Sequence, residues 1–172
     1  MTRYVVLLRG VNVGGHHPVK MADFAALLTS LGCSQVATYL QSGNAVVTAS
    51  ADRSALQEGV AAALGVGVLL RTSEQWAAVI AGNPYGTAAA ADPTTVHAAL
   101  LSATPTAAAY ARLDPAAYAP DACALGDAVL YLHYPNGAGR SKLTGAVLER
   151  LGVVATARNW RTVNALRDLL DR

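Results

Sequence analysis

The sequence is poor in charged residues, in cysteine and in aromatic side chains, and these shortages exclude several classes of protein. Of its 172 residues 14% are charged, 6% are aromatic and 53% are apolar, which is ample for the core of one domain or of two small ones. No apolar stretch reaches the roughly 18 residues that a membrane helix needs, and the N-terminus lacks the long apolar segment of a signal peptide. The two cysteines, Cys33 and Cys123, lie far apart in apolar settings, which predicts buried free thiols. We therefore expect a cytoplasmic protein without a membrane partner.

The few charges are unevenly distributed along the chain. The net charge is +2, yet residues 129–167 contain six basic residues against the single acid Glu149. Such an asymmetry can mark a face for an anionic partner, or it can reflect solvated charges on amphipathic helices. A net charge of +2 is low for a dedicated nucleic-acid-binding protein, so nucleic acid is the less favoured partner.

Hydrophobic periodicity in the first half predicts two helices and four strands. Residues 4–9 form a continuous apolar run typical of a strand, and residues 21–31 have the i, i+3, i+4 spacing of a helix that Gly32 can close. Residues 36–41 and 45–48 predict a hairpin, residues 52–64 a helix with Asp52 as N-cap, and residues 67–71 a strand. The order β-α-β-β-α-β is that of a ferredoxin-like unit.

The second half repeats this order. After a linking helix at 73–81 and a loop at 82–93, we expect strands at 95–102, 121–125, 128–133 and 153–157, and helices at 106–113, 141–151 and 159–170. The predicted fold class is therefore α+β, with two tandem β-α-β-β-α-β ferredoxin-like halves, an extra linking helix and a C-terminal helix. The predicted division is 1–81 for the first half with the linking helix, 82–94 for the linker, and 95–172 for the second half with the terminal helix.

Uncharged polar residues and glycines gather in two places that this topology brings together. In the first half the strand order 4-1-3-2 places the loop after the first strand beside the turn between strands two and three. This arrangement defines a first polar cluster, consisting of Arg9, Asn12, Gly14, Gly15, Gln41, Ser42 and Asn44. In the second half the corresponding argument applies to the opposite end of the sheet, where it brings the loop at 135–142 to the end of the last strand. The second polar cluster consists of Arg140, Ser141, Lys142, Arg158 and Asn159.

Four segments of the chain closely resemble a bacterial family catalogued as domain of unknown function 1697. The segments are Leu7–Gly15, Met21–Phe24, Thr38–Asn44 and Ala157–Val163, and their order and spacing match from end to end. The resemblance implies a cytoplasmic α+β protein with ferredoxin-like subdomains, in agreement with the element order above. It implies no established activity and no catalytic residues.

The chemistry of the two clusters favours binding of an anion. The Gly-rich loop at 135–142 carries Arg140 and Lys142 and is expected to open a helix at Ser141, where free N–H groups and the helix dipole favour phosphate. An ordinary turn at the start of a helix is the alternative interpretation. The loop is not a Walker A motif, and the glycines at 10, 14 and 15 are not a Rossmann fingerprint, because the spacing and the strand order do not fit.

Acid–base and metal chemistry find little support in the sequence. The two clusters contain no carboxylate that could form an acid–base pair, and the four histidines lack the spacing of metal ligands. We therefore predict no metal site, and the sequence leaves open whether the protein is an enzyme, which cofactor it uses and what its oligomeric state is.

Two hypotheses of different classes follow from these observations. The first is a cytosolic protein that binds a phosphate-bearing or other anionic small ligand, such as a nucleotide, through the residues of both clusters. The alternative is a protein-interaction or self-association module in which the motifs have structural roles and no ligand is bound. On the first hypothesis we also expect the clusters to merge into one composite site.

Overall fold

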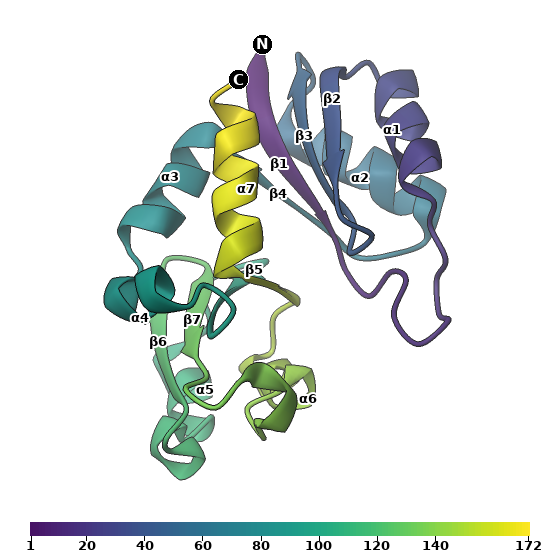
Figure 1. The fold of residues 1–172 in the computed structure, drawn as a ribbon. Helices are drawn as coiled ribbons and strands as arrows, with labels where there is room; N and C mark the ends of the chain where they lie inside the picture. The colour runs from purple at the N-terminus through teal and green to yellow at the C-terminus, as the bar shows by residue number, and fades with distance from the viewer. The chain divides into compact units, whose positions relative to one another are not determined.

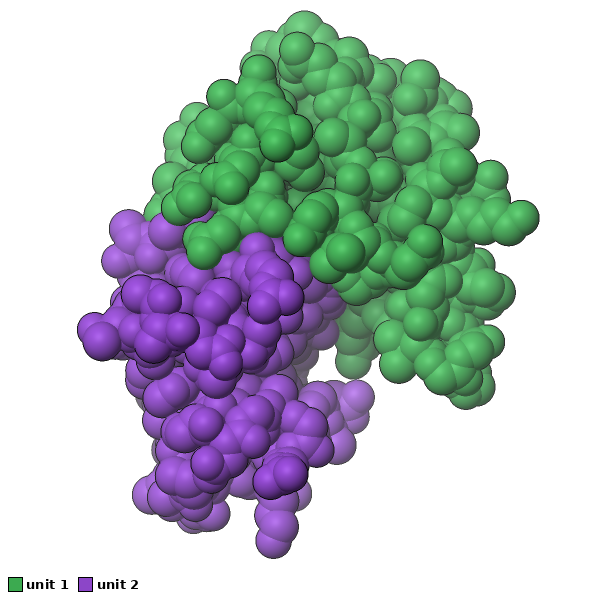
Figure 2. All heavy atoms as spheres, viewed as in Figure 1, with its two compact units in different colours: residues 1–78, 164–172 green, residues 79–163 purple.

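The structure, a computed structural model, describes residues 1–172 and divides them into two packing units (Figure 2). Unit 1 comprises residues 1–78 and 164–172, and unit 2 comprises residues 79–163. The helices α3 (Ser73–Ala81) and α7 (Trp160–Leu170) each contribute residues to both units. No helix combines the length and apolarity that crossing a bilayer requires.

Unit 1 contains a four-stranded antiparallel sheet in the order β2-β3-β1-β4, as the sequence predicts (Figure 1). Its elements before α3 are β1 (Thr2–Leu8), α1 (Met21–Ser30), β2 (Ser34–Tyr39), β3 (Asn44–Ala49), α2 (Arg53–Leu64) and β4 (Val68–Thr72). The predicted caps are confirmed. Asp52 Oδ1 accepts a hydrogen bond from Ala55 N at 2.9 Å, and Gly32 ends α1 with φ +84° while Cys33 N donates to Leu28 O.

The core of unit 1 explains why β1 is apolar from Tyr4 to Leu8. Tyr4, Val6 and Leu8 pack on one face of the sheet with the buried side chains of α1 and α2, such as Phe24 and Val60. The intervening residues, among them Leu7, are buried on the opposite face. A strand covered on both faces is a continuous apolar run rather than an alternating one, which is the pattern read from the sequence.

Unit 2 repeats the same sheet in the order β6-β7-β5-β8. Its elements before α7 are α4 (Gly86–Ala91), β5 (Val96–Leu101), α5 (Ala107–Arg112), β6 (Ala122–Gly126), β7 (Val129–His133), α6 (Gly145–Leu148) and β8 (Ala155–Asn159). Short 3-10 turns lie at Pro115–Tyr118, Ala138–Arg140 and Glu149–Leu151. The two tandem α+β halves predicted from the sequence are thus present.

Three features of the second half differ from the prediction. The predicted loop at 82–93 contains α4, because its run of alanines has a helix propensity that outweighs the flanking Gly and Pro. The predicted helix at 141–151 is instead an extended segment followed by α6 and a 3-10 turn. The last part of α7 belongs to unit 1, where Arg3 Nη1 and Nη2 donate to Leu170 O and Leu169 O, so the packing units differ from the predicted division.

Candidate functional site

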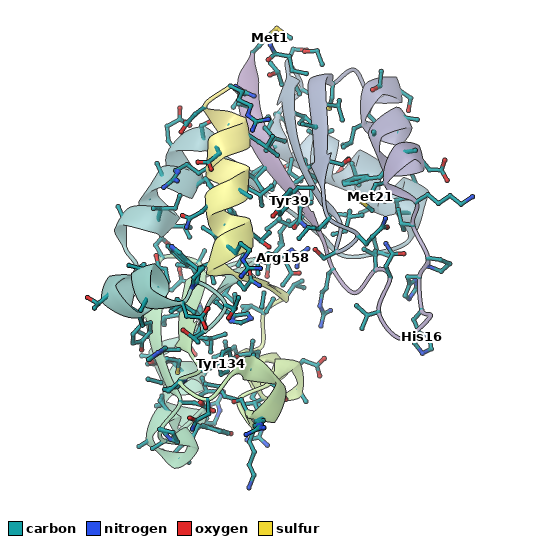
Figure 3. All side chains as sticks on the ribbon, in the orientation of Figure 1. Met1, His16, Met21, Tyr39, Tyr134 and Arg158 are labelled. Atoms are coloured by element: carbon teal, nitrogen blue, oxygen red, sulfur yellow. The ribbon has the colours of Figure 1, made fainter.

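The connection between β1 and α1, residues 9–20, forms a narrow projection that we call the β1–α1 finger (Figure 3). Its tip is a two-residue β-turn in which His16 N donates to Val13 O at 3.0 Å. The central residues Gly14 and Gly15 have φ of +57° and +76°, the signs of a type I′ turn, which favours glycine at both places. A second backbone hydrogen bond closes the finger below this turn, where Asn12 N donates to His17 O at 3.2 Å.

The Asn12 side chain fixes the base of the finger to the β2–β3 turn. Its Nδ2 donates to Gln41 O at 2.7 Å and to Val19 O at 2.8 Å, and its Oδ1 accepts from Val19 N at 2.8 Å. The predicted proximity of Asn12 and Gln41 is therefore confirmed. Because all these partners are backbone groups of the chain itself, the amide of Asn12 positions two loops.

Asn44 performs a similar task inside the β2–β3 turn. The side chain is fully buried, and its Nδ2 donates to Tyr39 O at 2.7 Å and to Ser42 Oγ at 2.8 Å. The turn also contacts β1 directly, since Leu8 N donates to Gly43 O at 2.8 Å. Of the first polar cluster, Asn12 and Asn44 thus hold the loops in place, whereas Arg9, Gly14, Gly15, Gln41 and Ser42 are exposed.

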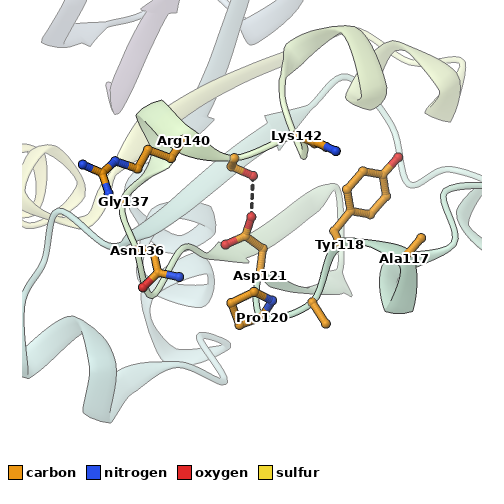
Figure 4. Close-up of a pocket in the computed structure, with 10 residues that line it drawn as sticks. Ala117, Tyr118, Pro120, Asp121, Asn136, Gly137, Arg140 and Lys142 are labelled. Atoms are coloured by element: carbon orange, nitrogen blue, oxygen red, sulfur yellow. Dashed lines mark hydrogen bonds between the residues drawn. The ribbon is translucent and has the colours of Figure 1, made fainter.

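Three residues of the second polar cluster, Arg140, Ser141 and Lys142, line a pocket of about 380 Å³ in unit 2 (Figure 4). The lining residues with polar side chains are Tyr118, Asp121, Asn136, Arg140, Ser141 and Lys142, and Gly137 and Pro120 are among the others. Arg140 and Lys142 are exposed, and neither side chain makes a hydrogen bond or an ion pair within the chain. Two uncommitted cations therefore border the same pocket, where they are available to an anion.

Ser141 has a different environment from the one expected. Its Oγ donates to Asp121 Oδ2 at 2.6 Å and accepts from Leu143 N at 2.9 Å, so the second cluster does contain a carboxylate. Ser141 is extended with ψ 145°, and α6 begins only at Gly145 and spans four residues. The predicted helix start at Ser141 is therefore wrong, and the helix-dipole argument for an anion at this residue does not apply. The physical reason is that Leu143 is buried in the core and its carbonyl is bound by Tyr134 Oη at 2.9 Å, which holds this segment extended.

Arg158 and Asn159 lie at the predicted end of the sheet but outside the lining of the pocket. Register places His97 of β5 opposite both Leu132 and Asn159, so the ends of β7 and β8 flank the same residue. Arg158 is buried, which lowers its pKa to about 10, and its Nη1 donates to Thr156 Oγ1 at 2.8 Å. Asn159 Oδ1 caps α7 by accepting from Thr162 N at 3.0 Å.

Sequence reasoning missed two polar side chains, the buried Arg71 and the half-buried His97. Arg71 of β4 is as buried as Arg158 and donates to Leu70 O at 2.9 Å. Its sequence signal is an arginine at the end of a strand, two residues before a helix, which is also the position of Arg158. His97 was considered only as a metal ligand. Burial lowers its pKa to about 4, and its Nδ1 has no hydrogen-bond partner.

Other chemically reactive groups are dispersed. No group of three or more His, Cys, Asp or Glu side chains is arranged to hold a metal ion. Both cysteines are free thiols, and burial raises the pKa of each, which disfavours the nucleophilic thiolate. The composite site formed by both clusters stays a prediction.

Two ferredoxin-like units in tandem, with polar loops at the sheet ends, define an α+β class of protein. The chain belongs to the family described as "Protein of unknown function (DUF1697)", whose sequence model matches residues 1–131. The motif at 157–163 lies outside this match. Among solved structures, the chain is similar to the conserved bacterial protein SP0830 from Streptococcus pneumoniae, with 22% identity, a TM-score of 0.72 and 98% coverage of both chains. That likeness shows the shared fold. No curated protein matches the chain.

Proposed function

We propose that this protein binds a phosphate-bearing or other anionic small ligand in the unit 2 pocket. The observation that carries the proposal is the pair of uncommitted cations, Arg140 and Lys142, on the lining of a pocket of about 380 Å³. A guanidinium offers a planar pair of donors to a phosphate, and an ammonium adds a mobile point charge. A volume of this size accommodates a small molecule.

The remaining lining residues narrow the ligand class. The amide of Asn136 and the hydroxyl of Tyr118 supply neutral hydrogen-bonding groups, while the carboxylate of Asp121 accepts from Ser141. A carboxylate beside two cations disfavours a ligand that is anionic throughout. It suits one whose anionic group is joined to hydroxyls, as in a nucleotide or a sugar phosphate, because those hydroxyls can donate to Asp121.

Thermal-shift screening tests this proposal. We expect nucleotides or sugar phosphates at millimolar concentration to raise the melting temperature of the wild-type chain, and the double variant Arg140→Ala/Lys142→Ala to lose that shift. Arg150→Ala removes an exposed arginine of the same unit that does not line the pocket, and should keep the full shift. Absence of stabilisation by every anionic ligand, or equal stabilisation of the double variant, would contradict the proposal.

The alternative function, a protein-interaction module, is supported by a separate observation in unit 1. The amides of Asn12 and Asn44, the two residues most central to the first polar cluster, bind backbone and hydroxyl groups of their own chain. Such internal bonding is typical of loops held in one shape, which suits recognition by a surface.

A further inference from the structure

We propose that the β1–α1 finger, together with the β2–β3 turn at residues 40–43, is an interaction surface for an acidic segment of a partner protein that carries an apolar side chain. This inference rests on the alternative function and on unit 1 alone, so it is independent of the pocket in unit 2. Four observations support it.

The finger is longer than the fold requires. In unit 1 residues 9–20 connect β1 to α1, whereas in unit 2 residues 102–106 make the equivalent connection from β5 to α5. Both connections link the same two positions of the same sheet order. Because five residues suffice for the topology in unit 2, most of the twelve residues in unit 1 are available for another purpose, and long ordered loops commonly have one.

The base of the finger is also held in place by hydrogen bonds. Four of its backbone positions have positive φ at glycine or asparagine, namely Gly10, Asn12, Gly14 and Gly15, and His17 adds a fifth with φ +45°. The three hydrogen bonds of the Asn12 amide then join the finger to residue 41. A loop that is already ordered loses little conformational freedom on binding, so a larger share of the contact energy appears as affinity.

Two exposed aliphatic side chains lie next in sequence to Asn12 and Gln41, the two residues that join the finger to the β2–β3 turn. Val13, next to Asn12, is 65% exposed, and Leu40, next to Gln41, is 55% exposed. Leu40 moreover has φ +57°, a left-handed conformation that Gly, Asn and Asp adopt more readily than a bulky residue. A polar residue would suit both the solvent and the backbone, so the exposed, left-handed leucine favours contact with an apolar group of a partner.

The charge of the region identifies the partner. The finger carries two cations, Arg9 and Lys20, and no acidic residue, and Asp23 is the only acidic residue in the first 51. An acidic partner is therefore complementary in charge. The exposed apolar groups are aliphatic, whereas proteins that bind single-stranded nucleic acid use aromatic side chains on which the bases stack. The combination favours an acidic protein segment over RNA.

Selection from a peptide library tests the proposal. A phage-displayed library of random peptides is panned against the immobilised full-length chain, and the enriched peptides are synthesised and titrated by fluorescence anisotropy. We expect peptides with net negative charge and at least one large apolar residue. Val13→Ser, Leu40→Asn and Lys20→Gln should each weaken their binding at least tenfold, whereas Val154→Ser, which removes an exposed aliphatic residue of unit 2, should leave it unchanged.

The outcomes separate the two levels of the proposal. A failure to enrich any peptide, together with no binding of a labelled oligouridylate, overturns the interaction function of unit 1. Enrichment of basic or uncharged peptides, or binding of oligouridylate that the same variants abolish, overturns the acidic partner while leaving an interaction surface. Peptide binding that none of the three variants weakens places the surface elsewhere and also contradicts the proposal. Since all three side chains are exposed, urea unfolding should show each variant to be folded.

Discussion

Units 1 and 2 have the same strand register across three corresponding strands, β3-β1-β4 in unit 1 and β7-β5-β8 in unit 2. Val5 pairs with Arg71 as Ala98 pairs with Arg158, and Leu7 pairs with Asn44 as Leu100 pairs with Val129. The backbone bond from Leu8 N to Gly43 O recurs from Leu101 N to Ala128 O, and that from Arg9 N to Gly67 O recurs from Ser102 N to Val154 O. The correspondence extends beyond the strands to the first residues of the loops.

The two units differ where those loops leave the sheet. Unit 1 has the long finger and a turn closed by the buried Asn44, while unit 2 has a short connection, a two-residue turn and Val129 in place of the asparagine. Unit 2 in turn has the pocket, which is lined by its α5–β6 and β7–β8 connections, whereas the connection between β3 and β4 in unit 1, which corresponds to the second of these, contains the regular helix α2. One framework therefore presents two kinds of polar surface, and each has to be judged by its own residues.

We expect the largest loss of stability from a substitution at Gly43, in the β2–β3 turn of unit 1, where unit 2 has Ala128. Gly43 and Ala128 both have positive φ, +82° and +50°. In unit 1 an added Cβ would lie 2.7 Å from Leu8 Cβ and 2.8 Å from Val11 Cγ2, and Val11 belongs to the finger that unit 2 lacks. We expect Gly43→Ala to lower the free energy of unfolding by about 3 kcal/mol, from overpacking together with the left-handed backbone.

The reciprocal variant supplies the control for that measurement. Ala128→Gly removes a strained side chain but loosens the unfolded chain, so its effect in urea unfolding should stay below about 1 kcal/mol. Equal effects of the two changes would show that the finger does not constrain the turn, and the comparison between the units would lose its physical basis.

A somewhat smaller effect concerns acid stability, which we expect to depend on unit 2. His97 stands where unit 1 has Tyr4, and burial lowers its pKa to about 4. The unfolded chain binds the proton near the ordinary value of 6.5 and the folded chain only near 4, so stability is retained above about pH 6.5 and lost as the pH falls toward 4. At about 1.36 kcal/mol for each pH unit below 6.5, the loss between pH 7 and pH 5 comes to about 2 kcal/mol.

Urea unfolding of the wild type and of His97→Phe at pH 7 and pH 5 measures this contribution. The phenylalanine cannot take up a proton, so the wild type should lose more stability between the two pH values than the variant does. Parallel losses in both proteins would show that the imidazole is not the source of the acid sensitivity.

The sequence predicts correctly those parts of the fold and of the candidate site that depend on local sequence patterns and on the order of the strands. The strand order, the Asp52 cap and the proximity of Asn12 to Gln41 followed from hydrophobic periodicity and crossover geometry. The helix expected at Ser141 failed because a tertiary contact, the burial of Leu143, overrides the Gly-rich local pattern. The partnership of Ser141 with Asp121 joins residues twenty apart, and no spacing rule indicates it.

The smallest expected effects distinguish a structural role from a binding role for the first polar cluster. Asn44→Ala removes a buried amide and leaves Tyr39 O without its 2.7 Å donor, which should lower the free energy of unfolding by about 2 kcal/mol.

Asn12→Ala breaks hydrogen bonds at an exposed site, where water can replace them, so we expect the free energy of unfolding to fall by about 1 kcal/mol. Urea unfolding of the two variants gives the order of effects. Unchanged stability in Asn44→Ala and Asn12→Ala would favour ligand binding by these amides and contradict their role in holding the β2–β3 turn and the base of the finger.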